Sequence, residues 1–260
     1  MKKLDKNNFS SWKEYYFEYQ RSLAADYYIP FLKDKNGVKL KDKNILEIGC
    51  GNGGFIDAFG DYSDNCVGFD LKDLEWDKSN VTYHRLNVFD QNLTDKIDLK
   101  FDVIILRDVI EHLDNRQTDM LFKQIDLISN KDTLILITFP PFYSPFGLHQ
   151  QVLLKSFLRF IPYLSLIPKE LIKILTEGDK DNKDGVEELL SLYDSKKSIG
   201  MFYKLVSQNG YRVLDEKFFH VRPSHEIRYG LKTIESRFIW NIPMLRELLI
   251  TGTVFLIKKY

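Results

Sequence analysis

The chain has 260 residues, of which 44% are hydrophobic, and its 37 basic residues balance 37 acidic residues. This length and composition suffice for one α/β domain with a full hydrophobic core, so a second domain is not required. The zero net charge excludes an overall field that would draw the chain to nucleic acid or to an anionic membrane, and we expect no nucleic-acid partner.

The first half of the chain predicts strands that alternate with helices. Aromatic residues between positions 10 and 33 recur with helical spacing, which predicts a leading helix that packs on or beside a sheet and stops at Pro30. An apolar strand at 44–48, a helix to about residue 60 and a strand at 66–70 form one βαβ unit. Three more strands follow at 81–86, 101–106 and 133–138, and an amphipathic helix is predicted at 115–129.

The pattern changes after residue 139. Residues 139–147, FPPFYSPFG, hold too many prolines for a strand or a helix, so we expect a rigid loop at the edge of the sheet where substrates bind. An apolar helical stretch broken by prolines follows at 150–176, and 178–185 is predicted to be a polar, charged loop. The last regular elements are a helix at 195–208 and strands at 211–220 and 253–258.

Alternation of strands and helices implies a parallel, doubly wound sheet. We therefore predict a Rossmann-like α/β fold with seven strands, mostly parallel and with a reversed last strand. The chain is expected to be a single domain over residues 1–260, with helical insertions on the substrate side at 142–185 and 222–249.

The sequence also bears on location and on cysteine chemistry. No stretch is both long and uncharged enough to span a bilayer, and no apolar segment follows the charged N-terminus. We expect a soluble, cytoplasmic protein for which peripheral contact with a membrane stays open. Cys50 and Cys66 have neither zinc-type spacing nor a disulfide framework, so both are expected to be free thiols in the core.

A glycine-rich turn follows the first strand, in ILEIGCGNGG at 45–54. Such a turn lets backbone N–H groups approach a nucleotide-like cofactor, and the next helix points its positive end there. Gly49, Gly51 and Gly54 also fit the dinucleotide fingerprint, so the turn alone leaves the cofactor open. Glu47 argues against a nicotinamide enzyme, because a carboxylate two residues before the first glycine can face a cationic amino group.

Three segments together resemble the motifs of class I S-adenosylmethionine-dependent methyltransferases. They are ILEIGCGNG at 45–53, VGFDL at 67–71 and FDVIILRDVIEHL at 101–113. The resemblance runs from about residue 40 to 140 and resumes at 195–260. It implies that the protein is a methyltransferase with S-adenosylmethionine as its cofactor.

The resemblance also implies which residues contact the cofactor. The glycine turn would line its methionine part, Asp70 would hold the ribose, and Tyr16 or Tyr19 would close over its carboxylate. Asn87 stands where the family usually has aspartate, and an amide can still accept a hydrogen bond from the adenine amino group. The cofactor residues expected in this way are Glu47, Gly49, Cys50, Gly51, Asp70, Leu71, Asn87, Val88 and Arg107.

Two histidines are candidates for a general base, which an alcohol acceptor needs. His149 closes the proline-rich loop and is our first candidate, because that loop lies at the substrate edge. His112 follows the fourth strand, where a histidine also has a structural role in the family. Asp108, Glu111 and His112 resemble part of the metal site of some small-RNA and quinone-precursor methyltransferases, so a bound Mg²⁺ or Zn²⁺ stays open.

The acceptor is the least determined part of the prediction. Residues 139–150 resemble a loop of methyltransferases from bacterial surface-polysaccharide pathways, which implies O-methylation of a sugar, a nucleotide-sugar or a lipid-linked glycan. Arg222, His225 and Arg228 are candidates for binding an anionic acceptor. A quinone-like or other small metabolite is the alternative acceptor, and a non-catalytic cofactor-binding protein is the alternative outside the enzymes. The oligomeric state stays open.

Overall fold

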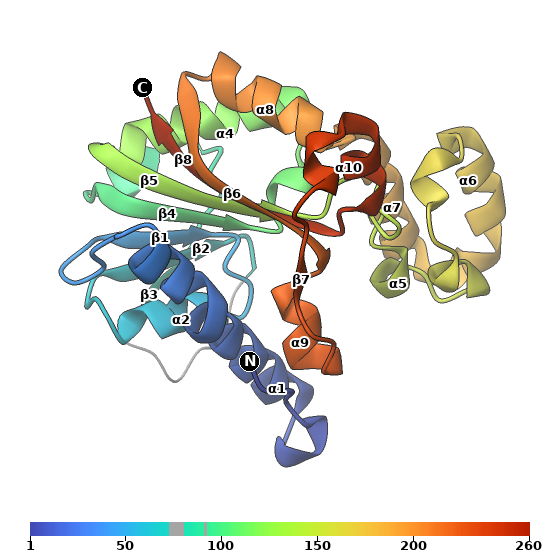
Figure 1. Cartoon of the computed structure of the whole chain (residues 1–260), viewed down its shortest axis with the longest axis horizontal. Helices are drawn as coiled ribbons and strands as arrows, with labels where there is room; N and C mark the ends of the chain where they lie inside the picture. The colour runs from blue at the N-terminus through green and yellow to red at the C-terminus, as the bar shows by residue number, and fades with distance from the viewer. Residues whose placement is uncertain (73–80, 91–92) are drawn as a thin grey trace.

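The computed structural model describes residues 1–72, 81–90 and 93–260, except for the side chains of residues 180, 181 and 240. Its centre is an eight-stranded sheet with the order β3-β2-β1-β4-β5-β8-β6-β7 (Figure 1). Strands β8 and β7 run antiparallel to their neighbours, and the other neighbouring pairs are parallel. The strands are β1 Ile45–Ile48, β2 Cys66–Asp70, β3 Val81–Arg85, β4 Phe101–Arg107, β5 Ser129–Phe139, β6 Tyr211–Val221, β7 Ile234–Glu235 and β8 Gly252–Lys259.

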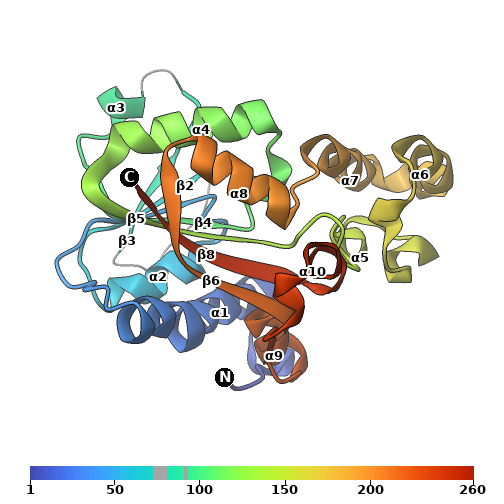
Figure 2. The same cartoon turned by 45° about the horizontal axis from the view of Figure 1, so that its top comes forward.

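Helices cover both faces of the sheet, and Figure 2 shows α1 and α2 on one side and α4 and α8 on the other. Alternate residues of a strand point to opposite faces, so each strand feeds two apolar layers. Ile45 of β1 packs in the α1/α2 layer, whereas Leu46 packs in the α4/α8 layer. The α-helices are α1 Trp12–Leu23, α2 Gly54–Gly60, α3 Leu93–Lys96, α4 Asn115–Ile128, α5 Gln150–Leu153, α6 Lys169–Leu175, α7 Lys183–Ser195, α8 Ile199–Gln208, α9 Pro223–Tyr229 and α10 Pro243–Leu249.

Side-chain caps define where the main helices begin. The Ser11 hydroxyl accepts the N–H of Glu14 at the start of α1. At the start of α4, Asp114 and Gln117 form a reciprocal capping box, which satisfies two backbone donors that the first turn leaves free. These local signals explain why the sequence predicted the α4 boundary closely.

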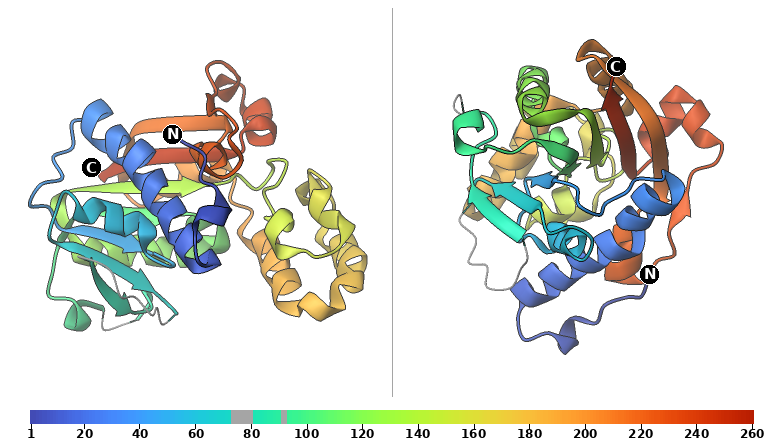
Figure 3. Two further views of the ribbon diagram at one scale, coloured as in Figure 1. Left: turned by 90° about the horizontal axis from the view of Figure 1, so that it is seen from below. Right: turned by 90° about the vertical axis from the view of Figure 1, so that its left-hand side faces the viewer.

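A separate lobe follows β5 and contains α5, α6 and α7. Figure 3 shows this lobe standing apart from the sheet, beyond the ends of the strands. It has an apolar cluster of its own, in which Phe142 and Leu148 of the proline-rich loop pack against helix residues such as Leu189 and Leu192. Phe139 ends β5, and the rest of the proline-rich loop contains neither helix nor strand, as predicted, and joins the lobe to the carboxyl edge of the sheet.

The prediction of seven strands was wrong, because the sheet has eight. The additional strand is β7, which has only two residues and pairs with β6. A two-residue strand is too short to give an alternating pattern of its own, so it depends on its neighbour rather than on local sequence. The predicted reversed last strand is confirmed, since β8 lies antiparallel between β5 and β6.

Two further predictions failed at helix ends. The leading helix does not stop at Pro30: the chain stays helical, with π-helical segments η2 at Ala24–Tyr28 and η3 at Phe31–Lys35 on either side of the proline. The wider π turns accommodate a residue that cannot donate an i to i−4 hydrogen bond. Residues 178–185 are helical rather than a polar loop, since they contain the end of the 3₁₀ segment η7 (Thr176–Asn182) and the start of α7.

Among the described residues, no helix is both long and apolar enough to cross a membrane. Cys50 and Cys66 are buried, free thiols, as the sequence predicted.

Candidate functional site

The glycine turn lies at the carboxyl end of β1 and is tied to β2. The N–H groups of Gly49 and Cys50 both donate to the carbonyl of Phe69, at 2.8 and 3.0 Å. Gly49 has φ of +74°, and a Cβ atom at that position would stand 2.6 Å from Cγ2 of Val109. A side chain at position 49 would therefore fill the space between the turn and Val109, which glycine leaves open.

Asp70, at the end of β2, lies beside this turn. Its carboxylate accepts the N–H of Gly51 at 2.8 Å and the N–H of Lys72 at 3.1 Å. Leu71, the next residue, is 64% exposed. Asp70 thus has a fixed orientation next to the most exposed glycine of the turn.

The two residues expected near an adenine follow β3. Asn87 is exposed, and its side-chain oxygen accepts the N–H of Phe89 at 3.0 Å. Val88 is buried in the α4/α8 layer. The Asn87 oxygen has a second lone pair, so the local turn leaves it able to accept one more hydrogen bond.

Glu47 and Arg107 form a buried ion pair on the α1/α2 side of the sheet. The Arg107 Nε atom lies 3.5 Å from Oε1 of Glu47, and neither carboxylate oxygen has a hydrogen-bond partner of good geometry. Burial raises the pKa of Glu47 to about 8, and the nearby guanidinium of Arg107 offsets only part of that rise. Arg107 also lies over the ring of Phe55, 5.0 Å from its centroid.

A cavity of about 760 Å³ opens at the carboxyl edge of the sheet. Parallel strands of doubly wound sheets bind their ligands at this edge. Its wall combines α1, the ends of β4 and β6, the proline-rich loop, the lobe and α9, which packs beside α1 in Figure 1. The wall residues used below are Tyr16, Tyr19, Arg107, Asp108, His112, His149, Val152, Arg159, Phe160, Arg222, His225, Arg228 and Tyr229.

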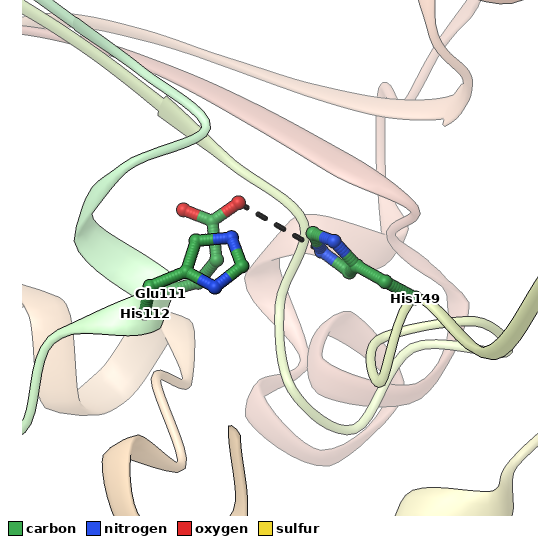
Figure 4. A group of neighbouring side chains, drawn as sticks. All are labelled: Glu111, His112 and His149. Atoms are coloured by element: carbon green, nitrogen blue, oxygen red, sulfur yellow. Dashed lines mark ion pairs between the residues drawn. The ribbon is translucent and has the colours of Figure 1, made fainter. Parts of the chain in front are cut away.

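His112 and His149 lie on this wall, and the buried Glu111 lies beside them (Figure 4). One potential metal-ligand atom of each side chain lies within 4.8 Å of those of the other two. The Nε2 atom of His149 is 3.8 Å from Oε1 of Glu111, and the two imidazole rings meet edge to face with centroids 5.4 Å apart. Residues far apart in sequence therefore form one polar cluster, which we call the Glu-His-His cluster.

Backbone geometry fixes the members of this cluster. Glu111 and His112 lie in the 3₁₀ segment η4 (Ile110–His112) after β4, and the hydroxyl of Ser195 donates to the Glu111 carbonyl. His149 has φ of +54° and caps the start of α5, and its N–H donates to the carbonyl of Phe146 at 3.0 Å. A left-handed conformation is uncommon for a residue other than glycine and is often found at functional sites.

Glu111 is buried, the two histidines are half-buried, and all three have shifted pKa values. Burial raises the pKa of Glu111 well above its ordinary range, and the neighbouring Asp108 carboxylate raises it further. Burial lowers the pKa of His112, and it lowers the pKa of His149 to about 4. Both Glu111 oxygens and the His149 Nε2 atom lack hydrogen-bond partners. These groups therefore favour their neutral forms and keep lone pairs free for a ligand.

Comparison with known proteins identifies the family. A model of the methyltransferase-domain family matches residues 16–175, which is more than half of the chain. The chain belongs to this family. Membership confirms the predicted enzyme class. The glycine turn alone was compatible with a dinucleotide or with S-adenosylmethionine, and the family favours S-adenosylmethionine as the cofactor.

Solved structures share the fold of this methyltransferase. An S-adenosylmethionine-dependent methyltransferase from Clostridium acetobutylicum is 11% identical with a TM-score of 0.52, over 92% of this chain and 92% of its own. Another from Archaeoglobus fulgidus is 15% identical with a TM-score of 0.50, over 95% of this chain and 100% of its own. No curated protein matches the methyltransferase sequence.

The fold of the methyltransferase brings most of the sequence-selected residues into two neighbouring groups. The glycine turn, Asp70 and the Glu47–Arg107 pair form one group, and the Glu-His-His cluster forms the other. Sequence reasoning missed Arg159 as a cavity residue and missed the pairing of Glu47 with Arg107. Strand periodicity carries a signal for that pairing, since both side chains point to the α1/α2 side.

Proposed function

We propose that the protein transfers a methyl group from S-adenosylmethionine to a hydroxyl oxygen of an acceptor bound in the 760 Å³ cavity. The observation that carries this proposal is the Glu-His-His cluster, whose two histidines line that cavity with the buried carboxyl group of Glu111 beside them. We take the acceptor to be a sugar, a nucleotide-sugar or a lipid-linked glycan, and a quinone-like metabolite is the alternative. A cytoplasmic location stays a prediction.

The cofactor residues suit S-adenosylmethionine. When bound, S-adenosylmethionine supplies a methyl group already activated on a sulfonium, so the chain mainly has to position and deprotonate the acceptor. The space that Gly49 leaves open and the buried carboxyl group of Glu47, whose oxygens accept no hydrogen bond of good geometry, fit the amino-acid part of this cofactor. Asp70 would hold the ribose hydroxyls, and Arg107 would hold the carboxylate.

The cluster would act on the proton of the acceptor. A hydroxyl is a poor nucleophile until a base removes its proton, and a base must lie within hydrogen-bond reach of that proton. His149 lines the cavity, and the lowered pKa of its imidazole keeps it at pH 7 in the unprotonated form that a base requires. Glu111 lies beside it, 3.8 Å from its Nε2 atom, and in its ionised form would stabilise the imidazolium that forms.

A second candidate is that the same cluster holds a divalent metal ion. Its favouring observation is the convergence of one carboxylate and two imidazoles whose ligand atoms lie within 4.8 Å of one another. These donor types suit Zn²⁺, and carboxylates also suit Mg²⁺. Glu111, His112 and His149 would then hold the metal, which would lower the pKa of an acceptor hydroxyl.

Replacement of His149 tests the proposal. We expect His149→Ala to lose methyl transfer by about 100-fold or more while its affinity for S-adenosylhomocysteine, measured by calorimetry, stays unchanged. His220→Ala is the matched control, because His220 lies on β6 outside the cavity. Undiminished turnover in His149→Ala would remove the assignment of this histidine.

Chelation separates the two candidates. The protein is treated with EDTA, freed of it, and assayed before and after addition of Mg²⁺ or Zn²⁺. Activity that survives chelation contradicts the metal and leaves His149 as the base. Activity that is lost and returns only with the metal supports the metal site instead.

A further inference from the structure

Three arginines of the cavity wall form no ion pair with any carboxylate that the structure describes. Arg159 comes from the lobe, Arg222 follows β6, and Arg228 lies in α9. Among the described side chains, no carboxylate lies within ion-pairing distance of any of the three, although Arg107 on the same wall is paired with Glu47. An unpaired cation at a cavity wall is a site for an anionic ligand.

The three guanidinium groups are held in place by their neighbours. A Cβ atom at Gly252 would stand 2.2 Å from Cδ of Arg222, so that glycine makes room for the arginine stem. The Nε atoms of Arg222 and Arg159 are shielded from solvent and lack hydrogen-bond partners.

Arg159 and Arg228 have further contacts that fix their direction. Arg159 donates from Nη2 to the carbonyl of Gln151 at 2.9 Å. Arg228 lies over the rings of Tyr19 and Tyr229, with its Cζ atom 5.5 and 5.3 Å from their centroids. Contacts of this kind preorganise a side chain and reduce the entropy it loses when a ligand binds.

The cavity wall is more positive than the chain as a whole. It carries four arginines, Arg107 and the three above, and one carboxylate, that of Asp108. The chain in total has equal numbers of basic and acidic residues, so this imbalance is local. His225, between Arg222 and Arg228 in sequence, has its pKa lowered to about 4 by burial and by these two arginines.

We propose that Arg159, Arg222 and Arg228, which line one cavity, bind phosphate groups of the acceptor, so that the substrate is a phosphorylated compound. This inference rests on the proposed methyl transfer in the same cavity and names the chemical class of its acceptor. Arginine presents planar, paired donors that match phosphate oxygens, which lysine does not. The phosphate would anchor the acceptor on the arginine side of the cavity while the Glu-His-His cluster acts on its hydroxyl.

The phosphate could belong to a nucleoside diphosphate or to a lipid diphosphate. Phe160 and Val152 also line the cavity and are 74% and 77% exposed, which would suit an isoprenoid chain that leaves the cavity beside Arg159. The two sources share the diphosphate chemistry, and the experiment below distinguishes them.

Calorimetric titration of the full chain saturated with S-adenosylhomocysteine tests the inference. The probes are inorganic pyrophosphate, UDP, and phosphatidylcholine vesicles with or without a polyprenyl diphosphate. We expect at least one diphosphate probe to bind, and Arg222→Gln and Arg228→Gln each to weaken that binding about tenfold. Binding of UDP indicates the nucleotide source, and binding only of the diphosphate vesicles indicates the lipid source.

Arg246→Gln is the matched control. Arg246 in α10 also has a buried, unpartnered Nε atom and lies over a tyrosine ring, that of Tyr203, but it does not line the cavity. We expect this variant to bind the probe as the wild type does. Binding of no diphosphate probe, or equal affinities of wild type, Arg222→Gln and Arg228→Gln, would overturn the inference.

The inference and the proposed function can fail separately. Pyrophosphate binding that depends on the arginines, in a protein that methylates no hydroxyl, contradicts the proposed function alone. Methyl transfer to a hydroxyl that proceeds equally in Arg222→Gln and Arg228→Gln contradicts the phosphate site alone.

Discussion

Glu47 shows how one buried side chain links the cofactor site to pH. Its carboxyl group is fully buried, and the raised pKa of about 8 means that it is mostly protonated at pH 7. The amino group of S-adenosylhomocysteine would pair with the ionised form. Binding should therefore release a proton and strengthen as the pH rises toward 8.

Glu47→Gln tests this link, because the amide has the shape of the carboxyl group but does not ionise. We expect the variant to bind S-adenosylhomocysteine about tenfold more weakly at pH 8 and without the proton release assigned to Glu47. Calorimetry in buffers of different ionisation enthalpy measures both quantities. Identical proton release in the variant would mean that Glu47 does not titrate on binding.

Lys197 is a second buried group with a measurable consequence. Its ammonium donates to the Thr118 hydroxyl at 2.9 Å, and burial lowers its pKa to about 8. Between pH 8 and the ordinary lysine pKa of 10.5, the unfolded chain binds this proton and the folded chain does not. The unfolding free energy therefore rises with pH across this window, and the protein loses that stability as the pH falls back through it.

Lys197→Met removes this titration. Across the window, we expect the unfolding free energy of the wild type to rise relative to that of the variant by about 3 kcal/mol at most. Urea denaturation of both proteins at several pH values measures the difference. A difference that is constant from pH 7 to pH 11 would show that Lys197 titrates normally in the folded protein.

The candidate site residues that belong to sequence motifs were predictable from the sequence, but the residues that they contact were not. The positions of Glu47 and Asp70 follow from short-range spacing around two strands. The pairing of Glu47 with Arg107 joins residues on two strands, and the meeting of His149 with Glu111 depends on a left-handed backbone turn. Contacts of this kind arise only when the chain is folded.

The glycine turn is the element on which the proposed cofactor site depends most. We expect Gly49→Ala to lose measurable affinity for S-adenosylhomocysteine and to lower the unfolding free energy by about 1–3 kcal/mol, because φ is +74° and Cβ would meet Val109 at 2.6 Å. Gly210→Ala is the control, since Gly210 has a similar φ of +77° and open space around it. Calorimetry and urea denaturation measure the two effects.

The two variants together separate strain from ligand binding. Gly210→Ala should lose stability and keep the affinity of the wild type. Wild-type affinity in Gly49→Ala would contradict the placement of the cofactor at this turn.

Elements with a strong local signal were predicted well, and those shaped by their neighbours were not. The proline-rich loop and α4 follow from prolines and from a capping box, which act within a few residues. Strand β7 exists only because β6 offers it a partner, and the helical path through Pro30 depends on π turns on both sides. No local pattern of 4 to 8 residues carries that information.

The molecule as a whole combines a sheet that carries the proposed cofactor site with a lobe and a helix α9 that complete the cavity. The doubly wound class and the reversed strand were predictable, because seven of the eight strands have a recognisable pattern in the sequence. The shape of the cavity was not, since its wall combines α1, the ends of β4 and β6, the lobe and α9. The acceptor therefore has to be inferred from the folded protein.

The transfer of an isotopically labelled methyl group from S-adenosylmethionine to a panel of phosphorylated and unphosphorylated sugars tests the central claim most directly. We predict label on a hydroxyl oxygen of a phosphorylated acceptor in the wild type, and its loss in His149→Ala while cofactor affinity is kept. Label on nitrogen or carbon, or equal labelling by wild type and His149→Ala, would contradict hydroxyl methylation at the Glu-His-His cluster.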